Sequence, residues 1–364
     1  MTTTVTSARP ATTGAATPLV VSASPHLTGR DSVATIMWNV VASLVPLVAM
    51  SAWLFGASAL VVVLASVVGA VATEHFVGRR GTIADGSAAI TGILLGLTLP
   101  AGIPLWMAVL GGAFAIGIGK LLFGGLGYNV FNPALLGRAF LMAAFPVALT
   151  TWPKVGTGGF WALRGDNFAL PFAAARHTDA VTAATPLGLF KFEHQLTGAS
   201  SLFFGNVGGS LGETSALLIL LCGSYLALRR FLDWRIPASV LGTVALLQGA
   251  LHLANGARYA SPAFALFGGG LMLGAVFMAT DMVTAPVTKL GRWVFGATIG
   301  LTVVVIRSWG GLPEGVMYAI LLANALVPYI NKVTQPRVFG IRRADAAPSK
   351  AIGSAPSEKK GVAR

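Results

Sequence analysis

Charged side chains are scarce in this sequence, and their scarcity argues against a soluble protein. Of its 364 residues, 10% are Asp, Glu, Lys or Arg and 55% are apolar, whereas soluble domains carry about 25% charged residues. So little charge cannot solvate a globular surface. Apolar runs of roughly 20 residues recur along the chain, which is the length that crosses the core of a bilayer. The composition therefore predicts one helical domain embedded in lipid.

Cysteine is nearly absent too, which limits the chemistry that the chain can perform alone. The single Cys222 excludes an intrachain disulfide, and it excludes an iron–sulfur cluster held by this chain, because a cluster needs several thiolates. We expect a small buried hydrophobe at this position. The sequence also lacks metal-site spacings, a hydrolase triad and a phosphate-binding glycine loop. It therefore predicts no metal, no catalytic residue of its own, and redox chemistry only through an organic cofactor or a partner.

Ten apolar runs organise the chain in two groups of five. They lie at residues 34–55, 57–77, 86–100, 103–123 and 134–150, and at residues 214–232, 236–254, 262–280, 293–308 and 314–331. A polar, glycine-rich loop at 151–213 separates the groups. We expect a disordered tail at 1–23, a membrane domain at 24–335 and a disordered basic tail at 336–364. The predicted fold is an all-α polytopic membrane protein with about ten transmembrane helices.

The net charge of +13 is distributed as membrane topology requires, not as a nucleic-acid surface. An excess of Lys and Arg marks cytoplasmic segments, and this pattern places both termini in the cytoplasm and the 151–213 loop on the extracytoplasmic face. Only Arg258 and Arg307 lie in short links on the outer face. The basic residues assigned to the inside are Arg79, Arg80, Arg138, Arg229, Arg230, Arg235, Lys289, Arg292 and those of the C-terminal tail. We expect a lipid bilayer as partner and no nucleic acid.

An odd number of helices before the loop reverses the second group relative to the first, as in inverted-repeat transport folds. Each group contains a short segment interrupted by Gly or Pro, at 85–100 and at 262–286. Paired segments of this kind predict helices that break inside the membrane around a site. The alternative is close helix packing, because Gly92 with Gly96 and Gly208 with Gly212 have the small-xxx-small spacing.

The segment DAVTAATP at 179–186 resembles the flavin-attachment sequence of membrane subunits in Rnf complexes and in the sodium-pumping NADH:quinone reductase. In that family a flavin transferase forms an FMN phosphoester on the last hydroxyl of the motif, which must be exposed for the transferase to reach it. The resemblance implies covalent FMN on Thr185, with Asp179, Thr182 and Ala184 in the recognised segment. Ala183 stands where the family pattern usually has Gly. Taken alone, the segment also fits a Thr- and Ala-rich loop that turns at the following proline.

Further motifs resemble the D subunit of Rnf complexes over residues 24–335. They are SPH at 24–26, GYNVFNPA at 127–134, GNVGGS at 205–210, GETS at 212–215, FMATD at 277–281, TAPVT at 284–288, RSWGG at 307–311 and PEG at 313–315. The resemblance implies a subunit that relays electrons in a complex that oxidises reduced ferredoxin, reduces NAD+ and moves Na+ or H+ across a bacterial cytoplasmic (inner) membrane. It also implies partner subunits with iron–sulfur and flavin centres, and a flavin transferase. Two alternatives stay open: a subunit of another flavin-dependent system such as the quinone-reducing complex, and a solute channel or transporter.

Polar residues at the ends of apolar runs are further candidates. Asp85, Glu213 and Asp281 lie where a carboxylate marks an ion or proton path or caps a helix. Asn132 and Arg138 suit a capped helix start with a cytoplasmic Arg anchor. The resemblance offers another role, since the quinone-reducing relative holds a non-covalent riboflavin: the glycine-rich loop before residue 134 and the segment 280–288 would line a second flavin pocket on the inner side. Asp85, Asn132, Glu213 and Asp281 are therefore candidates for an ion site or a second flavin site.

Overall fold

The computed structural model describes residues 31–78, 82–153, 160–161, 164–171, 185–205, 207–256 and 258–336. Over these residues the chain forms helices joined by irregular segments, without a β-strand. The predicted tails, apart from Pro336, lie outside the described residues, as does much of the predicted 151–213 loop.

The N-terminal half is a series of helices. Ser32 caps the first of them, because its hydroxyl accepts a hydrogen bond from the Thr35 amide. The elements are α1 (Val33–Phe55), α2 (Ala57–Val77), the short η1 (Thr82–Asp85), α3 (Ser87–Leu97), α4 (Leu105–Ile116) with a π-helical extension η2 (Gly117–Leu121), α5 (Pro133–Ala144) and α6 (Pro146–Thr150).

The C-terminal half begins immediately after Thr185. Its elements are α7 (Pro186–Gly188), the π-helical η3 (Leu189–Glu193), α8 (Ala199–Phe204), α9 (Ala216–Leu228), α10 (Arg235–Ala254), α11 (Pro262–Phe267), α12 (Leu271–Leu273), the π-helical η4 (Gly274–Met278), α13 (Lys289–Trp309) and α14 (Val316–Thr334). Each of the ten predicted runs contains helix. Of the described helices, α1, α2, α10, α13 and α14 are long and apolar enough to cross a membrane, which confirms a multi-pass helical protein.

Large apolar side chains cover the outside of the long helices. Trp53, Leu64, Leu246, Leu253 and Tyr329 are all exposed. A soluble monomer rarely exposes such extended apolar surface. Contact with lipid chains explains the exposure, because it removes this surface from water.

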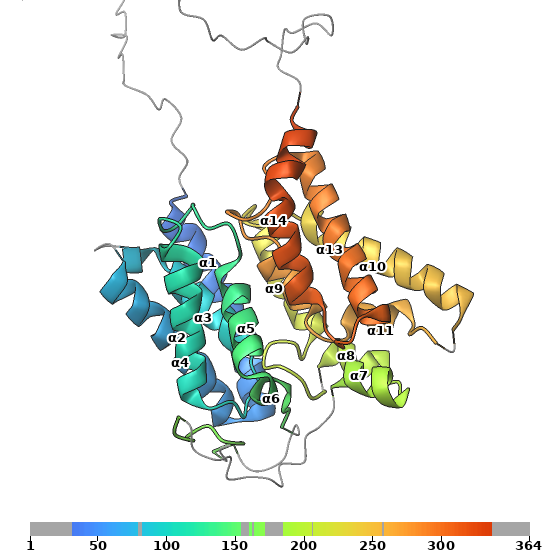
Figure 1. The fold of residues 1–364 in the computed structure, drawn as a ribbon, viewed down its shortest axis with the longest axis horizontal. Helices are drawn as coiled ribbons and strands as arrows, with labels where there is room; N and C mark the ends of the chain where they lie inside the picture. Colours follow the sequence, from blue (N-terminus) through green and yellow to red (C-terminus); the bar gives the residue numbers. More distant parts are fainter. Residues whose placement is uncertain are drawn as a thin grey trace, which may run out of the picture.

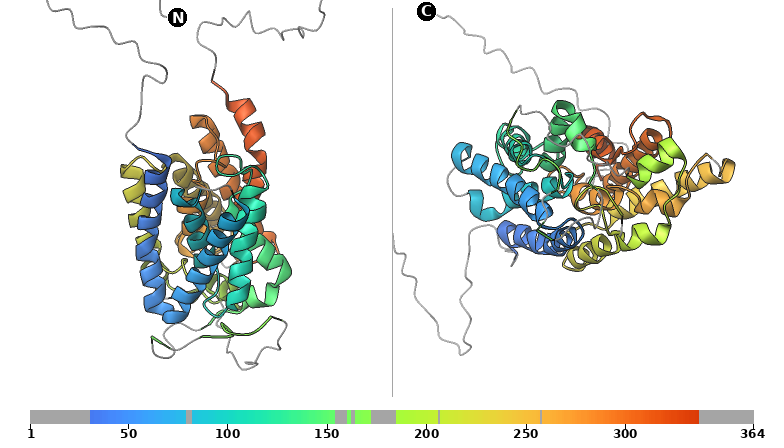
Figure 2. Two further views of the ribbon diagram at one scale, coloured as in Figure 1. Left: turned by 90° about the vertical axis from the view of Figure 1, so that its left-hand side faces the viewer. Right: turned by 90° about the horizontal axis from the view of Figure 1, so that it is seen from below.

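The helices form two groups that lie side by side (Figure 1; Figure 2, right). In the N-terminal group α2 packs closely on α3 and α4. A Cβ at Gly92 would lie 2.5 Å from the Cα of Val67 on α2, and one at Gly96 would lie 2.8 Å from the Cα of Val63, so the predicted small-residue packing is confirmed here. For Gly208 and Gly212 it is wrong, because both lie in the irregular segment between α8 and α9.

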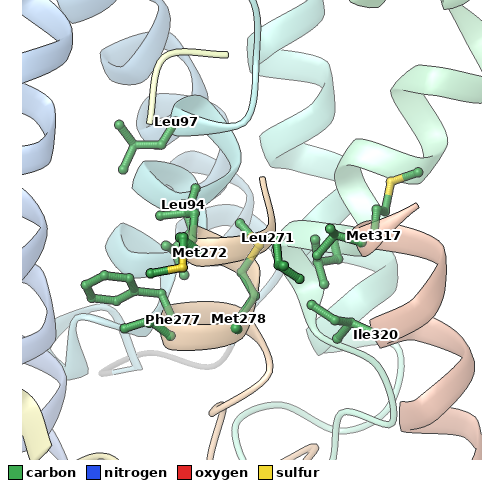
Figure 3. Close-up of a cluster of buried hydrophobic side chains, with 14 of the residues drawn as sticks. Leu94, Leu97, Leu271, Met272, Phe277, Met278, Met317 and Ile320 are labelled. Atoms are coloured by element: carbon green, nitrogen blue, oxygen red, sulfur yellow. The ribbon is translucent and has the colours of Figure 1, made fainter. Parts of the chain in front are cut away.

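A broken segment of the C-terminal half crosses the interface between the groups. The predicted interruption within 262–286 is confirmed, since this stretch folds as three short pieces, α11, α12 and η4. Figure 3 shows side chains of α12 and η4 between α3 and α14, in a cluster that includes Leu94, Leu271, Met278 and Met317. In the first group α3 is instead one continuous helix of 11 residues.

The two ends of the molecule differ. Figure 1 places α6, α7 and α8 at one end, here called the α7 end, and the start of α1 and the close of α14 at the opposite end. One cavity lies at each end.

Candidate functional site

Thr185 lies directly before the first helix of the C-terminal half. It is the N-cap of α7: its Oγ1 accepts a hydrogen bond from the Gly188 amide at 3.1 Å, and Pro186 occupies the first helical position. The side chain is only 7% exposed, so the expectation that the acceptor hydroxyl is exposed is wrong for Thr185. In a phosphoester of Thr185, the Oγ1 atom would keep a lone pair and could still accept the hydrogen bond from the Gly188 amide. The other motif residues, Asp179, Thr182 and Ala184, lie outside the described residues.

A cavity of about 230 Å³, here called the α7 pocket, lies beside this segment. Cations and aromatic rings dominate its wall, and none of the described residues that line it is a carboxylate. Its lining is Leu187, Phe190, Lys191, His194, Gln248, Arg258, Tyr259, Ala260, Phe264, Ala265, Arg307, Ser308 and Pro313. Such a wall suits a planar ligand with negative charge, because aromatic rings stack on planar groups and cations pair with phosphate.

Two cations of the α7 pocket are held in place by backbone carbonyls. Lys191 Nζ donates to the carbonyl oxygens of Arg307, Gly310 and Leu312, at 3.2, 2.6 and 2.8 Å. It thereby satisfies carbonyls at the C-terminal end of α13. Arg307 in turn donates to the carbonyl oxygens of Ala265 and Gly268. Partial burial lowers the pKa of the Lys191 ammonium from its ordinary value.

A second cavity of about 100 Å³, here called the interface cavity, lies between the two helix groups. Both halves contribute to its wall, which mixes apolar side chains with amides, hydroxyls and two opposite charges. Its lining is Met37, Val40, Ser87, Ile90, Thr91, Leu94, Lys120, Leu126, Asn129, Asn132, Pro133, Ala134, Leu226, Phe231, Leu232, Val276, Phe277, Thr280, Asp281, Met282 and Val283. Of the predicted candidates, the structure brings Asn132 and Asp281 together here.

Asn132 performs two tasks at once. Its Oδ1 accepts from the amides of Ala134 and Leu135 and caps α5, while its Nδ2 donates to the Met278 carbonyl of the opposite half at 3.0 Å. The predicted cap is therefore confirmed, and the same residue lines the cavity. Asp281 accepts from the Thr284 hydroxyl at 3.1 Å and from a backbone amide.

A buried ion pair beside the interface cavity was missed from the sequence. Lys120 Nζ lies 2.5 Å from Glu74 Oε1, with side-chain exposures of 3% and 0%. The ammonium also donates to Ser87 Oγ at 2.6 Å, and this hydroxyl donates to Asp85 Oδ1 at 2.6 Å. Asp85 is therefore one hydrogen bond removed from the cavity and does not line it. A lysine inside the apolar run 103–123 was the available signal, since a charge at membrane depth needs a partner.

Arg138 lies in a second buried network, so its prediction as a cytoplasmic anchor is wrong. From α5 it donates to Glu213 at 3.1 Å and to Glu314 at 3.0 Å, two carboxylates of the opposite half. Its single positive charge thus offsets part of the carboxylate charge that burial would otherwise penalise. Glu213 and Asp281 were candidates for the same site, but Glu213 pairs with Arg138 and does not line the interface cavity with Asp281. Glu314 was within a quoted motif but was not singled out.

Comparison with known proteins agrees with this architecture. The model of the NQR2, RnfD, RnfE family matches residues 20–340. The chain is 42% identical over 337 residues to the D subunit of the proton-translocating ferredoxin:NAD(+) oxidoreductase complex of Clostridium ljungdahlii, covering 89% of this chain and 96% of that one. It is 43% identical to the D subunit of the ion-translocating oxidoreductase complex of Stutzerimonas stutzeri, covering 85% and 93%. Identity is 39% to the D subunit of the Na(+)-translocating ferredoxin:NAD(+) oxidoreductase complex of Acetobacterium woodii, covering 89% and 96%. Matches of this extent show that the chain belongs to the NQR2, RnfD and RnfE family.

Proposed function

We propose that this chain is the D subunit of an ion-translocating ferredoxin:NAD+ oxidoreductase, in which it relays electrons through flavins. Support comes from relatives that bear this name and match nearly their whole length. Such a subunit works with partner subunits that carry iron–sulfur and flavin centres. The single Cys222, buried in α9, leaves this chain without thiolates for a cluster of its own.

We propose that FMN is esterified to Thr185 by a flavin transferase and that its ring occupies the α7 pocket. The observation that carries this proposal is that Thr185 caps α7, whose Leu187 lines the pocket together with Phe190 and Lys191. Flavin supplies one- and two-electron transfer once it is bound. The protein supplies the hydroxyl, the cations and the aromatic wall. Because Thr185 is buried, the transferase acts while the hydroxyl is still accessible.

We propose a second, non-covalent flavin of the riboflavin type in the interface cavity. Its wall offers donors and acceptors from Asn129, Asn132 and Asp281, and apolar faces from Ile90 and Phe277. The chemistry of this wall, with apolar faces and a few polar groups, is of the kind that recognises an amphipathic planar ring with a polar edge. A flavin at each end of the molecule would give electrons a path across it.

For ion coupling we propose the buried charges between the halves, Asp281 together with the Arg138–Glu213–Glu314 network. Carboxylates at membrane depth are costly and mark ion or proton paths. Relatives are named for proton translocation in one case and for Na+ translocation in another. Either cation would interact with these carboxylates.

The proposed topology is ten crossings in a five-plus-five inverted arrangement in a bacterial inner membrane, with both termini cytoplasmic and the Thr185 segment extracytoplasmic. The position of α7 opposite the start of α1 and the close of α14 supports it (Figure 1). In a Cys222→Ala background, an impermeant thiol reagent added to intact cells should label a Gly158→Cys variant and spare a Ser354→Cys variant. The reverse labelling would invert the topology.

The flavin assignment is tested on the whole chain coexpressed with an active flavin transferase. After denaturation, in-gel fluorescence and intact mass should report one covalent flavin, and peptide mapping should place it on the fragment that contains Thr185. A chain without covalent flavin under these conditions would remove the basis for the redox role of the α7 pocket.

A further inference from the structure

The π-helical segments coincide with the two cavities. π-helices account for well under 1% of residues in globular proteins and occur mostly as single-turn insertions, often at functional sites. The described residues contain η2, η3 and η4. η3 lines the α7 pocket, whereas η2 and η4 line the interface cavity from opposite halves. The side chain that η2 contributes to the cavity is Lys120.

The Lys120 ammonium presents positive charge to the interface cavity. Its two hydrogen bonds, to Glu74 Oε1 and Ser87 Oγ, leave one of its three N–H groups without a partner among the described residues. Glu74 does not line the cavity, so the negative end of the ion pair points away from it. Glu74 Oε2 also has no hydrogen-bond partner in the described part of the chain. The pair therefore acts toward the cavity as a dipole with its positive end inward.

Among the described residues of the cavity wall, the other charged group comes from the opposite half. Asp281 lies in the segment after η4, where the Thr284 hydroxyl and the Val283 amide donate to its carboxylate. The side-chain amide of Asn129, from the opposite half, also forms a hydrogen bond to this carboxylate. The remaining polar groups that described residues contribute to the wall are the amides of Asn129 and Asn132 and hydroxyls of Ser and Thr, all of them neutral.

We propose that Lys120 sets the reduction potential of the flavin in the interface cavity by stabilising its reduced, anionic form. This inference rests on the non-covalent flavin proposed above. An oxidised flavin ring is neutral. Reduction adds two electrons, which an iron–sulfur donor of the complex delivers one at a time, and one proton. The reduced ring therefore carries one negative charge. The positive end of the Lys120–Glu74 pair lies nearer to that anion than the negative end does, and the dipole stabilises the anion because little water screens it. Lys120 is a potential-setting residue and needs no covalent step of its own.

The test uses the full-length chain with Thr185→Val, so that visible absorbance reports only flavin held non-covalently. The purified protein is loaded with riboflavin, and its midpoint potential is measured by spectroelectrochemical titration. The informative variant is Lys120→Met with Glu74→Gln, because it removes both charges and leaves no unpaired buried carboxylate. The matched control is Lys120→Arg, which retains the cation.

We expect the double variant to lose the preference for reduced over oxidised riboflavin by at least about tenfold, which lowers the potential of a two-electron couple by about 30 mV. Lys120→Arg should stay close to the parent. An unchanged potential in a double variant that still binds riboflavin would overturn the role of Lys120 and leave the cavity assignment intact. A parent chain that binds no riboflavin would overturn the cavity assignment, and the inference with it.

Discussion

The α7 pocket and the interface cavity differ in how the chain builds them. The α7 pocket is formed by the C-terminal half alone and contains cations without carboxylates in its described wall. The interface cavity combines both halves and places Lys120 and Asp281 on opposite sides of the boundary between them. A pocket of one charge sign suits a ligand that is permanently anionic, such as a phosphoester. A pocket with both signs suits a ligand whose charge changes during the reaction.

The largest effect is expected at Thr185, the proposed flavin acceptor next to the α7 pocket. Thr185→Val should abolish covalent flavin completely, because it keeps the branched shape and removes the nucleophilic oxygen. Thr185→Ser is the matched control and should remain modified. In-gel fluorescence and mass of the denatured chain measure both. The Thr185→Val chain should still bind riboflavin, because the substitution does not alter the interface cavity. This result would separate the two cavities. Covalent flavin on another peptide of the variant would refute the acceptor.

The buried network between the halves should show the next largest effect. Arg138→Met removes the cation that is hydrogen-bonded to both Glu213 and Glu314, and breaking a buried pair in this way costs about 3–5 kcal/mol. The thermal unfolding midpoint in detergent should fall, and it should recover as pH is lowered because the two carboxylates then bind protons. Adding Glu213→Gln and Glu314→Gln to Arg138→Met should restore much of the stability. Equal midpoints for Arg138→Met and the parent would show that the network does not hold the halves together.

Asp281→Asn tests the charge in the interface cavity, because Asn has nearly the same shape as Asp and is neutral. Hydrogen bonds to a charged group contribute about 1.5–3 kcal/mol, so riboflavin affinity should fall by about tenfold or more. In the assembled complex, electron transfer or ion transport should decline more than abundance does. Glu193→Gln, which alters an exposed carboxylate at the α7 end, is the control. Normal turnover and normal ion transport in Asp281→Asn would show that Asp281 only caps its own segment.

Lys191→Met should give the smallest effect. It removes the donor to the carbonyls of Arg307 in α13 and of Gly310 and Leu312 just after it, and because the group is partly solvated we expect a loss of about 1 kcal/mol of stability. The unfolding midpoint should fall slightly, and riboflavin affinity in the interface cavity should not change. Lys191→Arg is the conservative control. A large loss of riboflavin binding would show that the two cavities are coupled through α13.

Local features of the chain were predictable because their causes are local. The apolar runs predicted where helices form, since a bilayer requires about 20 apolar residues per crossing. Asn132 before Pro133 predicted the start of α5, because an amide side chain caps free backbone N–H groups. The interruption of 262–286 followed from its glycines. The burial of Cys222 followed from its apolar neighbours.

The sites depended on contacts that local patterns do not encode. Lys120 pairs with Glu74 across 46 positions, and Arg138 pairs with Glu314 across 176. Their positions in the sequence indicate that each charge needs a partner but not which one, and Arg138 was assigned to the wrong environment for that reason. The π-helical turns at Lys120 and Lys191 also lack a signature in composition. By itself the sequence determined where the helices form and which family motifs the chain carries, and it predicted Thr185 as the acceptor hydroxyl. Only the tertiary structure decided which buried charges meet, because such pairs are selected by the packing of the two halves.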